Sequence, residues 1–186
     1  MRRFAGIMLV LYLLTGCSSK NNALDQAATI RKNILDANQC SFDVTITAFY
    51  DEYIHTFEVI CVADHSGTLQ FTVISPESIS GITGTISNDG AALTYDNTIL
   101  AFPMLADGRV SPISGTWLFL NTLRSGYLTG CGENEAGLNL SIDDTFEDNP
   151  LHLEIQTDQQ HVPIAAEIYY QQKRVLLLEI RNFTLQ

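Results

Sequence analysis

The residues of this sequence best suited to covalent chemistry are its four cysteines, Cys17, Cys40, Cys61 and Cys131. A thiol can carry a thioether-linked lipid, form a disulfide or, as a thiolate, bind a metal ion. The histidines stand at no zinc-ligand spacing, and the H-E-x-x-H, nucleophile-elbow, P-loop and dinucleotide motifs are missing from the sequence. The sequence therefore predicts no metal, no cofactor and no catalytic residue, and we expect the chain not to be an enzyme.

Cys17 follows a leader that has the three parts of an export signal. Two arginines precede an apolar run over residues 4–14, and small residues come before the cysteine. The run is shorter than the roughly 20 residues that a membrane-spanning helix needs. The segment Leu14-Thr15-Gly16-Cys17 resembles a lipobox, so we predict a signal peptide over residues 1–16 and acyl chains such as palmitate on a diacylglycerol-modified Cys17. The alternative is an ordinary secretory signal in which the cysteine has no part.

The charge of the chain limits its partners. Without the two leader arginines, the formal net charge goes from −11 to −13, because every acidic residue lies after the leader. Nucleic acid is excluded as a partner, since binding phosphates needs positive charge. We predict that residues 17–22 are a lipidated N-terminus with a short polar tether and that residues 23–186 form a single domain. It would be anchored at the extracytoplasmic face of the cell membrane, or to the outer membrane in a two-membrane bacterium.

Cys40 and Cys61 belong to two segments with the two-residue alternation of half-buried strands. Residues 40–48 and 53–61 each place an apolar row on one face, and a turn near Asp51-Glu52 joins them. In one register the two cysteines are directly opposite, so we predict a disulfide between them, with buried free thiols as the alternative. Cys131 is predicted to be a small core residue.

Two segments have the apolar spacing of helices. The first begins after Asn22 and ends near Asn38, and it is amphipathic. The second begins at Ser111-Pro112 and ends at Gly126; it is apolar nearly all round, which predicts burial on more than one side. A strand over residues 116–121 is the alternative. On this second helix, Trp117 and Leu120 either line a cavity for a lipid or belong to the core.

The rest of the chain consists of short segments with strand-like patterns. Besides 40–48 and 53–61, they cover residues 68–75, 81–87, 91–95, 98–102, 127–132, 137–143, 151–157, 162–171 and 174–183. A long antiparallel sheet with an apolar face needs a cover, and the two helices are the candidates. The sequence thus predicts an α+β fold, a curved open antiparallel sheet (half-barrel) of about eleven strands wrapped around two helices.

The order of these elements, together with three local segments, resembles the LolA/LolB-like lipoprotein-localisation superfamily. The segments are residues 76–82, residues 105–124, and residues 163–167 followed by 178–183. The resemblance spans residues 23–186 and implies a half-barrel whose apolar cavity holds acyl chains, and binding rather than catalysis. The lipobox is a departure from the soluble carriers of this type.

Two functions follow as expectations. The first is a membrane-anchored extracytoplasmic lipoprotein that binds a lipid, or the acyl chains of a lipoprotein, in the half-barrel cavity. The second is a non-catalytic interaction or sensor lipoprotein, whose core is filled by its own side chains and whose surface contacts another envelope protein.

Overall fold

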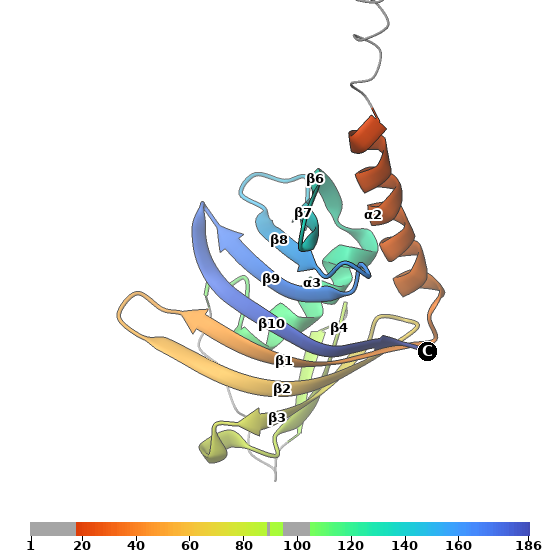
Figure 1. The fold of residues 1–186 in the computed structure, drawn as a ribbon. Coiled ribbons are helices and arrows are strands. Elements are labelled where there is room, and N and C mark those ends of the chain that lie inside the picture. The colour runs from red at the N-terminus through yellow and green to blue at the C-terminus, as the bar shows by residue number, and fades with distance from the viewer. Residues whose placement is uncertain (1–17, 89, 95–104) are drawn as a thin grey trace, which may run out of the picture.

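The computed structural model describes residues 18–88, 90–94 and 105–186, and these form one curved sheet with two α-helices. Ten strands in these residues follow the order β5-β4-β3-β2-β1-β10-β9-β8-β7-β6, and every pair of neighbours is antiparallel. The sheet curves around α3 (Pro112–Ser125), and α2 (Ser18–Asp36) lies beside one end (Figure 1). The predicted α+β half-barrel is confirmed. The count of about eleven strands is wrong for the described residues, which have ten; the strand predicted over 98–102 lies outside them.

The strands form two meanders that meet in the middle of the sheet, where β1 pairs with β10. The first meander contains β1 (Gln39–Phe49), β2 (Ile54–Asp64), β3 (Leu69–Ser75), β4 (Thr83–Ser87) and β5 (Gly90–Thr94), with the short 3-10 helix η1 (Glu77–Ile79) between β3 and β4. The second contains β6 (Tyr127–Asn134), β7 (Gly137–Asp143), β8 (Leu151–Thr157), β9 (Pro163–Tyr170) and β10 (Lys173–Leu185). The three longest strands, β1, β2 and β10, therefore lie next to one another in the middle of the sheet.

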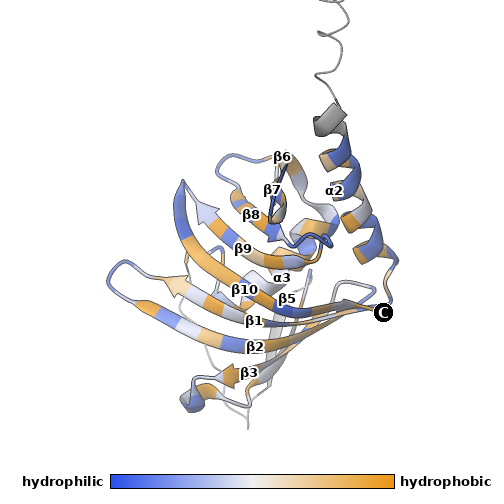
Figure 2. Cartoon of the chain, viewed as in Figure 1, coloured by the Kyte–Doolittle hydropathy of each residue, from blue (hydrophilic) through white to orange (hydrophobic). Residues whose placement is uncertain are grey.

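The inner face of the sheet is apolar because buried and exposed positions alternate along the strands. In β1, every second residue from Cys40 to Ala48 is buried. Apolar and polar residues alternate along many of the strands in Figure 2. The concave side therefore carries the core, and the convex side carries most of the polar residues.

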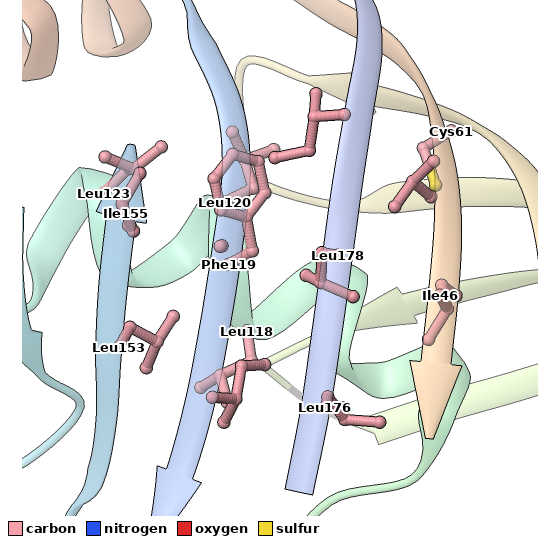
Figure 3. Close-up of a cluster of buried hydrophobic side chains, with 14 of the residues drawn as sticks. Ile46, Cys61, Leu118, Phe119, Leu120, Leu123, Leu153, Ile155, Leu176 and Leu178 are labelled. Carbon is pink, nitrogen blue, oxygen red and sulfur yellow. The ribbon is translucent and has the colours of Figure 1, made fainter. Parts of the chain in front are cut away.

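Helix α3 fills the concave side. Its N-cap Ser111 and Ser114 form a capping box, Pro112 occupies the first helical turn, and nine of its residues are buried. Leu118, Phe119 and Leu120 lie among inward side chains of several strands, including Ile46 (Figure 3). The predicted second helix and its burial on several sides are confirmed, and the alternative strand over 116–121 is excluded.

Helix α2 begins earlier than predicted. It starts at Ser18, not after Asn22, so the segment predicted as a tether is helical from its second residue. No proline or glycine interrupts residues 18–22, so the hydrogen-bonded ladder continues toward the N-terminus. The predicted amphipathic character is confirmed, because one apolar stripe faces the body. It consists of Ala23, Ala27, Ile30 and Ile34. Neither described helix has the length and apolar composition to cross a membrane.

Candidate functional site

An apolar crevice of about 190 Å³ lies between α2 and the C-terminal half of the molecule. One wall is the α2 surface, and the other is formed by residues of α3, β6 and β7. The lining residues are Leu24, Ala27, Ala28, Arg31, Leu123, Leu128, Leu140 and Ile142. Apart from Arg31, every one of them is apolar, so the crevice can take hydrocarbon but offers little to a polar ligand.

The crevice exists because α2 meets the body through small side chains. Ala27 is buried against the body, whereas Ala28 is exposed at the edge of the contact, and neither can fill the space beside the helix. Leu24 at the rim is 51% exposed, and Leu128 opposite is only partly buried. An exposed leucine beside an apolar hollow leaves hydrocarbon surface in water, and a ligand that covers both would remove that surface.

Arg31 forms the polar border of the crevice. Its Nε donates to the Leu123 carbonyl at 2.9 Å, and its Nη2 donates to the Gly126 carbonyl at 2.8 Å. These carbonyls lie at the C-terminal end of α3, where the helix leaves acceptors unpaired and carries negative partial charge. Burial lowers the pKa of Arg31 from its usual value. The guanidinium thus fixes the middle of α2 to the end of α3.

Trp117 and Leu120 do not line this crevice. Leu120 is 1% exposed and belongs to the core, whereas Trp117 is partly buried and packs against it. The Trp117 indole Nε1 donates to the carbonyl of Gly67, in the loop between β2 and β3, at 3.1 Å. This hydrogen bond holds the ring against that loop. Of the two interpretations left open by the sequence, these contacts favour core packing, and a role of the two residues in a lipid cavity stays a prediction.

Cys40 and Cys61 are buried free thiols, and the register predicted for a disulfide is wrong. Cys40 pairs with Ala63, and Phe42 pairs with Cys61, so the cysteines are diagonal neighbours. Diagonal positions in a sheet are about 7–8 Å apart, beyond the usual reach of a disulfide. The loop between β1 and β2 sets this register. Burial raises the pKa of each thiol to about 12.

The other cysteines and the histidine His55 lie apart from the crevice or outside the described residues. Cys17 lies outside the described residues, so its lipidation stays a prediction. Cys131 is partly buried and packs against the core, and its thiol donates to the Ala23 carbonyl on α2 at 3.2 Å. His55 is exposed and lies against the Tyr50 and Tyr53 rings. In the described part of the chain, no group of three or more metal-binding side chains comes together.

Sequence reasoning missed both the crevice and the role of Arg31. The amphipathic pattern indicated the inward face of α2, but Arg31 lies outside the apolar stripe of that helix, and no role was predicted for it. Its partners are more than 90 positions away in the sequence. The one available signal was Leu24, an apolar residue off the stripe of an otherwise polar helix surface.

No protein-family model matches the sequence. No curated protein matches it either. Among solved structures, an uncharacterised conserved protein from Thermus thermophilus aligns with a TM-score of 0.48 at 12% identity, over 90% of this chain and 87% of that one.

A LolA superfamily protein from Nitrosomonas europaea aligns with a TM-score of 0.44 at 9% identity, over 86% of this chain and 93% of that one. A putative outer membrane lipoprotein-sorting protein domain from Vibrio parahaemolyticus aligns with a TM-score of 0.39 at 6% identity, over 89% of this chain and 93% of that one. The LolA superfamily, which the sequence resembles, is thus named among the structural neighbours. At such low identity the likeness says nothing about ligand or partner.

Proposed function

We propose that this chain is a non-catalytic envelope lipoprotein, attached to a membrane through acyl chains on Cys17, that holds one hydrocarbon chain of a lipid or of another lipoprotein against α2. The observation that carries the proposal is the apolar crevice beside α2. The leader and its lipobox would place the protein at the extracytoplasmic face of the membrane, or at the outer membrane of a two-membrane bacterium.

The size of the crevice decides how much ligand it takes. An apolar cavity of about 150 Å³ is enough for a benzene-sized ligand, so about 190 Å³ accommodates the end of one acyl chain rather than a whole lipid. Burial of about six methylenes would contribute about 5 kcal/mol. A binding free energy of this size gives only weak affinity for a free ligand in water. For a protein tethered at a membrane, the high local concentration of lipid compensates.

The experiment fills the crevice from its exposed rim. Ala28→Trp places a large side chain beside the crevice, and Thr29→Trp places the same side chain at the neighbouring exposed position of α2, outside the lining. The full chain and both variants are expressed with their leader and purified in a mild nonionic detergent. Non-covalent lipid is then extracted into chloroform–methanol and quantified by mass spectrometry.

The expected result is a stoichiometric lipid in the parent and in Thr29→Trp, and at least a tenfold lower content in Ala28→Trp. Equal lipid in all three proteins would mean that it binds elsewhere, for instance in detergent micelles. No extractable lipid in any of them, together with failure to bind a fluorescent fatty acid, would overturn the proposal.

A second candidate function is binding of another envelope protein by a half-barrel with a filled interior. The specific observation is the packing of α3, because Phe119, Leu120 and Leu123 are at most 2% exposed against the concave face. Such a protein would act through its outer surface. In-cell crosslinking of the full chain, followed by mass spectrometry, would then find a stable protein partner regardless of the Ala28→Trp substitution.

A further inference from the structure

A second hollow, of about 600 Å³, lies on the convex side of the sheet, and we call it the outer groove. It crosses β7, β8 and β9 and is bounded by the segments that follow β7 and β9. Its lining residues are Asp143, Asn149, Pro150, His152, Glu154, Tyr169, Gln171 and Gln172. This is the opposite face of the sheet from α3, so the groove is separate from the crevice beside α2.

The polar side chains of the outer groove are arranged by strand register. Asp143 pairs with His152, and His152 pairs with Tyr169, which gives one row across three strands. Glu154 pairs with Glu167 in the adjacent row. Because side chains of paired residues point to the same face, these groups form one continuous surface.

Within this surface, His152 is held between two carboxylates. Its Nδ1 lies 2.6 Å from Asp143 Oδ1, and its Nε2 lies 2.8 Å from Glu154 Oε1. Burial lowers the pKa of His152, but the hydrogen bonds to Asp143 and Glu154 outweigh burial and raise that pKa above its usual value. A protonated His152 carries one positive charge, so it neutralises only one of the two negative charges of Asp143 and Glu154.

Glu154 directly opposite Glu167 is an arrangement that costs stability, because like charges across a ladder repel. Glu167 is partly compensated by Arg174 at 3.1 Å and by the Tyr169 hydroxyl. Glu154 accepts from His152 and from the Ser141 hydroxyl. A surface that keeps such a pair is suited to receive a cation, since local violations of good packing and charge rules concentrate at functional sites.

An exposed aromatic pair lies beside the outer groove. Phe146, in the segment between β7 and β8 that also supplies Asn149 and Pro150, is 81% exposed. Its ring packs on Tyr127 at the edge of the sheet. The same segment carries Asp144, Glu147 and Asp148. Carboxylates beside exposed aromatic rings match a ligand that is both cationic and partly apolar.

We infer that the outer groove and the Phe146–Tyr127 pair form a docking surface for a basic segment of another protein. An arginine or lysine of that segment would pair with Glu154 in the groove and with Glu167, its cross-strand neighbour beside the groove, and an apolar neighbour would cover Phe146. Charge complementarity selects this occupant. Nucleic acids, anionic lipid headgroups and a second copy of this chain, whose formal net charge is −11, all have the wrong sign.

The test measures binding of a labelled basic peptide to the full chain in nonionic detergent. The probe is a fluorescein-labelled peptide of alternating arginine and leucine, and the matched probe replaces arginine with glutamate. Fluorescence anisotropy at low and moderate salt gives the dissociation constants. The groove variant is Glu154→Gln with Glu167→Gln, and the control is Glu52→Gln with Glu77→Gln, which changes net charge equally at exposed sites in the other half of the sheet.

The expected result is at least a tenfold weaker affinity for the groove variant and less than a twofold change for the control. Phe146→Ala is expected to weaken binding about threefold without loss of folding, because its side chain is mostly exposed. Equal losses in the groove variant and the control would show unspecific attraction to an acidic protein and overturn the inference. So would absence of binding by the parent chain, or equal affinity for the glutamate peptide.

Discussion

Removal of the Arg31 guanidinium is the sharpest test of how α2 is held on the body. Arg31→Met keeps the aliphatic stem and the helix propensity but removes both hydrogen bonds to the end of α3. The Leu123 and Gly126 carbonyls would lose their charged donor. Part of this loss would be made up by water, since the guanidinium is only part-buried.

The size of the effect follows from these two contacts. Hydrogen bonds to charged groups contribute about 1.5–3 kcal/mol each, and favourable charge at a helix C-terminus adds about 0.3–1 kcal/mol. Allowing for partial exposure, we expect a loss of about 2 kcal/mol in the free energy of unfolding. For a chain of this size, that corresponds to a fall in Tm of about 4–8 °C.

The assay is urea unfolding of the full chain in nonionic detergent, followed by circular dichroism, with Tm measured by calorimetry. Lys32→Met is the matched control, because the Lys32–Asp36 pair is exposed and such pairs contribute at most about 0.5 kcal/mol. If Arg31→Met lost no more stability than Lys32→Met, the assignment of Arg31 as the link between α2 and α3 would be wrong.

Three further outcomes test other parts of the structure. Gly115→Ala is expected to destabilise the fold by about 1–3 kcal/mol in urea unfolding, because the added Cβ would lie 2.4 Å from Leu176 Cδ1; an unchanged midpoint would contradict the packing of α3 on the sheet. The raised pKa of His152 means that its contribution is complete below pH 6.5 and is lost as the pH rises through the folded-state pKa. His152→Gln should therefore flatten the pH dependence of stability by less than about 1 kcal/mol, since the side chain is 36% exposed, and an unchanged slope would count against the carboxylate bridge. Cys61 has a pKa raised to about 12 and no exposed surface, so it should react with iodoacetamide at pH 8 far more slowly than the partly buried Cys131. Mass spectrometry of timed digests measures the two rates of alkylation. Equal rates would contradict the burial of Cys61.

The sequence was sufficient to predict most helices and strands and which face of each is buried. The alternation in residues 40–48 predicted the inner face of β1, and Ser111-Pro112 predicted the start of α3. These signals are local, since a strand face repeats every two residues and a helix cap is set by its own side chains. The start of α2 was predicted late, because polar residues without a glycine or proline neither favour nor stop a helix.

The candidate site could not be predicted from patterns within short segments of the sequence. The register of β1 against β2 depends on the loop between them, and a shift of two residues keeps every side chain on its face while moving Cys61 from Cys40 to Phe42. The crevice depends on how closely α2 approaches β6 and β7, and Arg31 finds its acceptors across the fold. The row of Asp143, His152 and Tyr169 likewise needs three strands to be placed side by side.

The start of α2 at Ser18 would have a mechanical consequence if Cys17 carries the proposed lipid. Nineteen helical residues span about 28 Å, and they begin at the residue that follows Cys17. At its other end, the helix is followed by Asn38, whose amide donates to the Gln186 carbonyl. A tilt of the helix would therefore be transmitted to the sheet through this hydrogen bond and through the buried face of α2. The anchor would set which side of the half-barrel faces the bilayer as well as how far the domain can reach from it.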